Sequence, residues 1–253
     1  MNDDVNEKNL KVERRKVSYL IEKRKFVIPG DLLAEGDYHA GRHTFKDGSK
    51  VYASMVGLSN NVGRNVYVVA LKGCYVPRGG DVVIGKVVEM RLGSWNIDIN
   101  SPYNAILFTS EALDRPFNAR REDMTRILDI GDLILAKVIS FDRTRGPALT
   151  IRESGLGKIV HGRIIRMTPT KIPRLIGRKG SMINMLTREM GCHITIGQNG
   201  LILISGKNPE LEDLTIQVIH MIEAEAHTSG LTDRITEFIK KEKSSVNAEK
   251  SEE

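Results

Sequence analysis

The sequence predicts a multi-domain chain in which two small β domains are followed by one α+β domain. Three observations predict this order. Short alternating strands punctuated by glycines fill residues 26–71, and a second set of apolar strands fills residues 75–152. After Gly157 the pattern changes to mixed strands and helices. The 253 residues exceed one average domain, and a hydrophobic content of 40% is enough for separate cores.

Residues 1–25 are polar and mostly charged, with basic clusters at 14–16 and 23–25. We expect a charged N-terminal segment here, a solvated tail with one short exposed strand. From Phe26 the sequence becomes more apolar. FVIPGDLLAEG contains two apolar stretches separated by a Pro-Gly turn, and in KVYASMVGLS and RNVYVVALKG the residues alternate in the manner of strands. Residues 26–71 are therefore predicted to form a small N-terminal β domain.

Residues 75–152 contain five apolar strands, in GDVVIGKVVEMRLG, SWNIDIN, NAILFTSEAL, DLILAKVISFD and PALTIR. Five short strands in this length predict a small closed barrel of the OB kind, whose face and loops commonly bind oligonucleotides. The connection between the third and fourth strands, DRPFNARREDMTRILDIGD, is unusually polar and carries four arginines, Arg115, Arg120, Arg121 and Arg126.

Residues 157–230 read as strand, helix, glycine-cation loop, helix, strand, strand and helix. KIVHGRIIRMT is the first strand, and the helix begun by IPRLI stops at Gly177. SMINMLTREM has helical apolar spacing, and QNG is a hairpin signal between two short strands. Residues 231–253 are expected to add a C-terminal helix over 231–241 and a charged, disordered tail.

The loop in PRLIGRKGSMI places Arg178 and Lys179 between Gly177 and Gly180. Glycine lets a backbone approach another group closely, and two adjacent cations indicate that this group is anionic. A helix starting at Ser181 adds N–H groups and a positive dipole end, which suit a phosphate. The net charge of +6 agrees with an anionic partner. The candidate loop residues are Arg174, Gly177, Arg178, Lys179, Gly180 and Ser181.

This element order, with GxxG between its first two helices, resembles the KH domain of type I. The resemblance implies that the loop clamps the backbone of single-stranded RNA while a neighbouring groove reads bases. Some KH domains instead pack against protein, and their GxxG never meets RNA. The sequence leaves both alternatives open.

The barrel sequences GDVVIGKVVEM, NAILFTSEAL and DIGDLILAKVISFD resemble the S1-type RNA-binding domain. In that family, aromatic residues on the second and third strands stack on bases, and Trp95 and Phe108 fall at those positions. Strand alternation places Trp95 on the same face as Ile97 and Ile99, so a core role is the alternative for this residue. Aromatic residues make up only 5% of the chain, so charge must carry most of any affinity for RNA.

The combination of VIPGDLL, YVPRGGDVVIGKV, WNIDIN and a single KH domain resembles the S1/KH cap components of the RNA exosome, in their archaeal form. The resemblance covers residues 10–240. It implies a non-catalytic cap with three copies on a hexameric phosphorolytic ring, docked by the N-terminal domain. Such caps capture single-stranded RNA, feed its 3′ end inward and often favour A-rich tails. Basic barrel residues would then line the pore: Arg120, Arg121, Arg126, Lys137, Arg143 and Arg145.

No motif for catalysis, a metal or a cofactor is present. GRKGS lacks the Walker A spacing, and HExxH does not occur. Glu223 and His227 are four residues apart, but two ligands do not make a metal site. Cys74 and Cys192 lack CxxC spacing and are expected to be reduced in a cytoplasmic protein. No apolar run is long enough to span a membrane.

Two other functions use the same modules. One is an S1/KH transcription elongation or termination factor, although the bacterial example has two KH domains in tandem. The other is a fragment of polynucleotide phosphorylase, in which the KH domain precedes S1. The leading β domain with VIPGDLL is the feature that argues against both.

Overall fold

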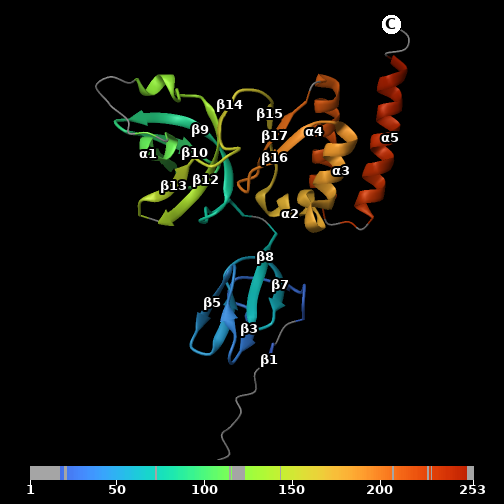
Figure 1. The fold of residues 1–253 in the computed structure, drawn as a ribbon. Helices are drawn as coiled ribbons and strands as arrows, with labels where there is room; N and C mark the ends of the chain where they lie inside the picture. The colour runs from blue at the N-terminus through green and yellow to red at the C-terminus, as the bar shows by residue number, and fades with distance from the viewer. Residues whose placement is uncertain are drawn as a thin grey trace, which may run out of the picture. The chain divides into compact units, whose positions relative to one another are not determined.

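The structure is a computed structural model that describes residues 18–19, 22–71, 73–113, 115, 123–142, 144–206, 208–226, 228 and 230–249. The chain divides into two compact units at the boundary between Lys72 and Gly73 (Figure 1). The expected order of β domain, barrel and α+β domain is confirmed.

The N-terminal unit consists of two four-stranded sheets around one small core. One sheet has the order β1-β3-β6-β5 and the other β2-β7-β8-β4. The strands are β1 (Ser18–Tyr19), β2 (Phe26–Val27), β3 (Leu32–Glu35), β4 (His39–Ala40), β5 (Thr44–Asp47), β6 (Lys50–Ala53), β7 (Gly57–Val62) and β8 (Asn65–Ala70). The core residues between them are Val27, Leu33, Ala34, Val51, Ala53, Val66 and Val68. The short strand expected within the charged N-terminal segment is present as β1, which pairs with β3.

The second unit begins with a closed five-stranded barrel. Its elements are β9 (Val82–Arg91), β10 (Ser94–Asp98), β11 (Ala105–Phe108), α1 (Thr109–Ala112), the 3-10 turn η1 (Met124–Arg126), β12 (Leu133–Asp142) and β13 (Gly146–Thr150). Strand β13 closes the barrel because it pairs with β11 in parallel and with β12 in antiparallel orientation. Inward residues that alternate along the strands form the core, including Val83, Trp95, Ile97 and Leu107.

The strand expected over KIVHGRIIRMT is two strands in the structure, so the single-strand prediction was wrong. β14 (Gly157–Ile159) pairs with β12 and extends the barrel sheet, whereas β15 (Arg163–Arg166) pairs with β17. Gly162 lies between them with φ +111°, a conformation that side-chain-bearing residues rarely adopt. The chain therefore leaves the barrel and enters the next domain at this glycine.

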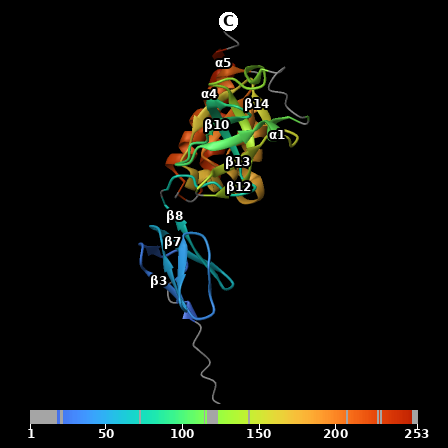
Figure 2. The ribbon, with the colours of Figure 1, turned by 90° about the vertical axis from the view of Figure 1, so that its left-hand side faces the viewer.

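The α+β domain has an antiparallel sheet of order β15-β17-β16, covered by helices on one side (Figures 1 and 2). Its further elements are η2 (Pro169–Lys171), α2 (Ile172–Ile176), η3 (Arg178–Gly180), α3 (Ser181–Met190), β16 (His193–Ile196), β17 (Leu201–Ser205), α4 (Pro209–Ala224) and α5 (Leu231–Glu249). Local signals explain the helix ends: the side chain of Asn208 caps α4, and Gly191 takes the left-handed conformation after α3.

Helix α5 belongs to the core of this domain and is longer than expected. Leu231, Ile235 and Ile239 are all buried in the same cluster as the residues of α2, α3 and α4. The helix continues to Glu249, where the sequence was interpreted as a disordered tail. The apolar positions 231, 235 and 239 lie four residues apart on one face, which is why the segment forms a packed helix.

The barrel and the α+β domain are joined by the turn between β16 and β17. Asn199 in this turn is fully buried, and its Nδ2 donates to the carbonyl oxygens of Ile84 at 2.6 Å and Ile99 at 2.8 Å. Its Oδ1 accepts from the Ile84 N–H at 3.4 Å. The adjacent Gln198 N–H donates to the Val82 carbonyl at 2.8 Å. The turn therefore satisfies polar backbone groups of the barrel that would otherwise be unpaired.

Apolar side chains reinforce this junction. Leu201 and Leu203 of β17 form a buried cluster with Ile84 of β9, on the side of the sheet opposite to the helices. Both faces of β17 are therefore covered, one by helices and one by the barrel.

Candidate nucleic-acid interface

The Gly177–Gly180 loop has a backbone that requires its first glycine. Gly177 ends α2 with φ +75°, and an added Cβ would lie 2.8 Å from the backbone nitrogen of Met182. Both the conformation and the space exclude a side chain there. Gly180 also has a positive φ of +79°, but an added Cβ would meet nothing closer than 3.5 Å. Lys179 between them has φ 52°, so the loop is held in a tight, left-handed path.

The charged groups of this loop point to solvent. Arg178, Lys179 and Ser181 are exposed, and neither cation forms an ion pair with the described residues. Helix α3 starts directly after the loop, so its partial positive charge adds to that of the two side chains. The loop therefore has the geometry and the charge to accept a phosphate.

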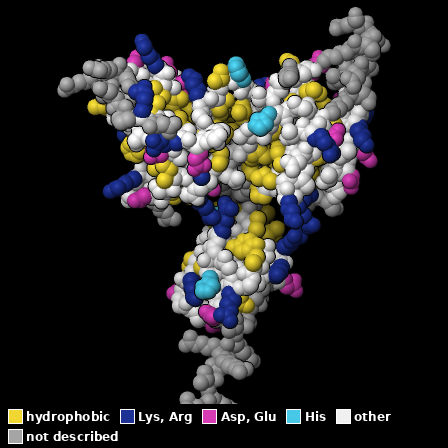
Figure 3. All heavy atoms as spheres, in the orientation of Figure 1, with side chains coloured by type: hydrophobic (Ala, Val, Ile, Leu, Met, Phe, Trp, Pro, Cys, Tyr) yellow, Lys and Arg dark blue, Asp and Glu magenta, His cyan; other side chains and the backbone are white. Residues whose placement is uncertain are grey.

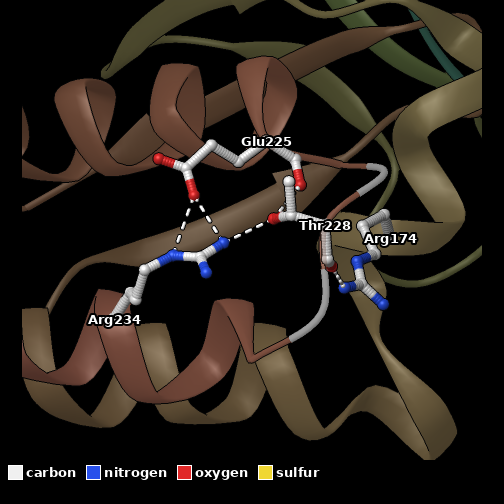
Figure 4. A network of polar contacts seen from close by, with 4 residues as sticks. All are labelled: Arg174, Glu225, Thr228 and Arg234. Carbon is white, nitrogen blue, oxygen red and sulfur yellow. Dashed lines mark hydrogen bonds and ion pairs between the residues drawn. The ribbon is translucent and has the colours of Figure 1, made fainter.

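Arg174 differs from the other loop candidates because its side chain contacts the domain itself. Its Nη2 donates to the carbonyl oxygen of Thr228 at 2.8 Å, in the connection between α4 and α5 (Figure 4). Arg234 of α5 also donates to Thr228, and its Nε and Nη2 contact the Glu225 carboxylate at 3.0 and 2.7 Å. Arg174 thus ties α2 to the start of the C-terminal helix.

The assignment of Trp95 to an RNA-stacking surface was wrong. Its side chain is 0% exposed, and its Nε1 donates to the Leu128 carbonyl at 3.0 Å inside the barrel. Strand alternation places it on the inner face with Ile97, so its ring is unavailable to a base. The alternative core role is the one the structure shows.

Phe108 lies on the outer face of the barrel and is 47% exposed. Strand register places it opposite Ser94, which in turn lies opposite Arg91. Opposite residues share one face of a sheet, so the three form a row across β11, β10 and β9. An aromatic ring beside a cation on this face suits stacking of a nucleic-acid base.

A polar cluster next to this row was missed by the sequence reasoning. Glu89 and Asn96 are paired across β9 and β10, and the Glu89 carboxylate accepts from Asn96 Nδ2 and from Arg91 Nε at 3.1 Å and Nη2 at 3.0 Å. Hydrogen bonds from Arg91 and then from Asn96 hold the pKa of Glu89 below its usual range. Glu89 therefore fixes the orientation of Arg91 and Asn96 beside Phe108. The strand alternation that points Trp95 inward also points Asn96 outward, and this pattern in the sequence could have indicated the cluster.

The basic barrel residues are not gathered into one site by the described structure. Lys137 forms an ion pair with Glu153, with Nζ 2.7 Å from Oε1, so its charge is partly neutralised. Arg126, at the end of η1, and Arg145, in the turn between β12 and β13, are exposed. Arg120, Arg121 and Arg143 lie outside the described residues.

Within the part of the chain that the structure describes, no group of three or more His, Cys, Asp or Glu side chains is placed to hold a metal ion. Glu223 instead accepts from the backbone N–H and the hydroxyl of Thr168, at 2.8 and 2.6 Å. Burial raises its pKa, but these hydrogen bonds outweigh burial and leave the pKa lowered. His227 lies outside the described residues. None of the described helices is long and apolar enough to cross a membrane.

The fold and the site define a class of protein: a multi-domain nucleic-acid-binding chain with an S1-type barrel locked to a KH domain. Family models match residues 24–72 as the Exosome RNA binding protein RRP4 N-terminal domain, residues 74–140 as the RRP4 S1 domain, and residues 163–219 as a KH domain. The chain belongs to the Rrp4 family.

Relatives named Exosome complex component Rrp4 show the same similarity along nearly the whole chain. The Thermofilum pendens protein is 44% identical over 226 residues, which cover 88% of this chain and 95% of that protein. The Pyrococcus furiosus protein is 44% identical over 221 residues, covering 87% and 84%. A crystal structure described as an exosome complex RNA-binding protein is 46% identical, with a TM-score of 0.65 over 68% of this chain and 98% of that one.

Proposed function

We propose that this chain is a non-catalytic cap component of a cytoplasmic exosome. It captures single-stranded RNA and delivers the 3′ end to a phosphorolytic ring of six subunits, with three cap copies on each ring. The observation that carries this proposal is the exposed Gly177–Gly180 loop, within a chain whose three modules all match the Rrp4 family.

RNA capture is supported by two surfaces on one rigid unit. The GxxG loop offers charge and a helix N-terminus to phosphates. The row of Phe108, Ser94 and Arg91 offers a stacking ring beside a guanidinium whose charge Glu89 partly neutralises. Because the buried Asn199 turn fixes the barrel to the KH domain, a strand bound to both surfaces follows a fixed path.

Ring docking is supported by an apolar outer face on the N-terminal unit. Phe26, Leu58 and Val69 are opposite one another on β2, β7 and β8, so they form a row on one face. Phe26 is 57% and Val69 46% exposed. Ile28, Val56 and Leu71, each two residues along the chain from a member of this row, are also exposed. Figure 3 shows hydrophobic side chains gathered on the surface of this unit. Exposed apolar patches of this kind are typical of protein interaction sites.

The docking surface is tested by co-assembly with purified ring subunits. Phe26→Glu with Val69→Glu is expected to abolish co-elution with the ring, because two charges would be buried at the contact. Phe45→Glu, which changes a 47% exposed ring on the other sheet, serves as the control. Retention of assembly by the double variant would contradict this assignment.

RNA delivery is tested by phosphate-dependent decay of a single-stranded RNA by the ring, with and without this chain. We expect the chain to accelerate decay and to release no nucleotide by itself. Arg178→Glu with Lys179→Glu is expected to remove most of the acceleration by repelling phosphates. Arg188→Glu, at the far end of α3, is the control. Equal decay with and without the chain would overturn the proposal.

A further inference from the structure

Helix α2, which leads directly into the Gly177–Gly180 loop, is anchored to the rest of the domain at two points on its polar side. Lys171, directly before the helix, donates from Nζ to the Glu223 carbonyl at 2.8 Å. One turn later, Arg174 donates from Nη2 to the Thr228 carbonyl at 2.8 Å. Both acceptors lie at or just beyond the C-terminal end of α4, where carbonyl groups lack helical partners.

The carbonyl that accepts from Arg174 is itself held in place by the connection between α4 and α5. The N–H and the hydroxyl of Thr228 donate to the Glu225 carbonyl, at 3.0 and 2.9 Å. The Glu225 carboxylate accepts from Nε and Nη2 of Arg234 at 3.0 and 2.7 Å, and Arg234 also donates to the Thr228 hydroxyl (Figure 4). Arg174 is therefore attached to a braced segment, and Arg234 of α5 supplies the brace.

We call Glu225, Thr228 and Arg234 the α5 anchor. The KH family model matches residues 163–219, which include α2 and the loop but end before the α5 anchor. A segment beyond the matched KH domain thus contacts the helix that carries the loop.

Helix α2 depends on such contacts because it has only five residues. Isolated helices shorter than ~12–15 residues are marginal in water, so tertiary contacts decide whether α2 stays formed up to Gly177. A loop that is already held in one conformation loses little further freedom when a ligand binds, and its affinity is higher for that reason.

We propose that Arg174 is a positioning residue for the RNA-binding loop: by bonding to the α5 anchor it holds α2, and with it the Gly177–Gly180 loop, ready for phosphates. Helix α5 thereby contributes to RNA affinity although its residues contact no RNA. This inference rests on the proposed function, because it assumes that the loop binds single-stranded RNA.

A direct contact between Arg174 and a phosphate makes a different prediction. Loss of one phosphate contact lowers the salt slope of single-strand binding by about 0.7. A positioning residue changes affinity and leaves the number of phosphate contacts, and hence the slope, as it was. A direct contact also gives Arg234 no role, since Arg234 reaches Arg174 only through Thr228.

The experiment measures the anisotropy of a labelled oligoadenylate with the full chain, over a series of salt concentrations. Arg174→Gln is expected to weaken binding roughly 5-fold with an unchanged salt slope, because a charge-assisted hydrogen bond that orders the loop is lost. Arg174→Lys keeps one donor for the Thr228 carbonyl and is expected to stay near wild type. Arg188→Gln removes an exposed cation at the far end of α3 and is the charge-matched control.

Two double variants test whether the residues act through the loop. Arg234→Gln is expected to weaken binding about 2- to 3-fold, and its combination with Arg174→Gln to be no weaker than Arg174→Gln alone, because both changes break one connection. In a chain that already carries Arg178→Glu with Lys179→Glu, Arg174→Gln is expected to have no further effect. Thermal unfolding of each variant establishes that it is folded at the temperature of the binding measurement.

Unchanged affinity in Arg174→Gln would overturn this inference and leave Arg174 a tie between helices without a role in binding. A salt slope lowered by about 0.7 in Arg174→Gln, with Arg234→Gln unchanged, would overturn it in favour of a direct phosphate contact. Failure of the proposed function looks different: Arg178→Glu with Lys179→Glu would then leave RNA affinity unchanged, and the inference would fall with it.

Discussion

Asn199 of the KH domain and Ile84 of the barrel exchange two hydrogen bonds, with the Asn199 amide bonded to both the carbonyl and the N–H of Ile84. A buried side chain here completes the backbone pairing of a neighbouring domain. This relationship makes the barrel and the KH domain one mechanical unit, so the proposed RNA-binding loop of the KH domain has a fixed position relative to the barrel.

Asn199→Ala is expected to lower the free energy of unfolding by about 2–4 kcal/mol, because the carbonyls of Ile84 and Ile99 would be left buried and unpaired. Urea unfolding of the full chain measures the change. Gln198→Ala is the matched control, since the Gln198 side chain is exposed and only its backbone contacts the barrel. Equal losses for the two variants would show that the Asn199 amide is not what joins the domains.

The two loop glycines are expected to respond differently to alanine. Gly177→Ala should cost at least ~2 kcal/mol of stability, because a left-handed φ is combined with a close approach to the Met182 nitrogen. Gly180→Ala meets no close atom and should cost only ~1 kcal/mol from its φ. Thermal unfolding of both variants measures the difference. A Gly180→Ala variant that is the less stable of the two would contradict the loop geometry.

Trp95 is the single tryptophan of the chain and offers a direct test of its buried role. Its fluorescence is expected to be shielded from an aqueous quencher and to stay unquenched when RNA is added. Trp95→Phe should lower the free energy of unfolding by about 1–3 kcal/mol, since the Leu128 carbonyl loses its donor. Quenching of this fluorescence by bound RNA would contradict the buried role and indicate that Trp95 contacts RNA.

Removal of residues 231–253 is expected to destabilise the KH domain severely. Leu231, Ile235 and Ile239 are buried in its core, and each such side chain contributes ~1.5–3 kcal/mol. Removal of residues 243–253 alone leaves these contacts and serves as the control. Hydrogen exchange of α2 and α4 reports the effect. Equal protection in both truncated chains would mean that α5 is an appendage of the domain.

Much of the domain order and the GxxG loop could be predicted because their signals are local. Glycines, a proline start and helical apolar spacing lie within short stretches around Gly177 and Asn208. Periodicity then indicates most of the order of strands and helices, but not the division of residues 157–166 into β14 and β15. Alternation along the strand, which is also a local signal, indicates that Trp95 shares the core face with Ile97 and Ile99.

The features that could not be predicted depend on contacts between distant segments. In the sequence, Asn199 is an ordinary turn residue. Its burial is explained only by its contacts with the backbone of Ile84 and Ile99 in the barrel. The cluster of Glu89, Arg91 and Asn96 requires the register of β9 on β10, including the irregularity after Asn96. Arg174 resembles a phosphate ligand in the sequence, but its partner Thr228 lies 54 residues away.

The measurement that tests the central claim most directly is the native mass and subunit composition of the complex that contains this chain, purified from its own cells. The account predicts a large assembly that contains the six subunits of a phosphorolytic ring and three copies of this chain. A lone chain, or one bound to RNA polymerase, would contradict it.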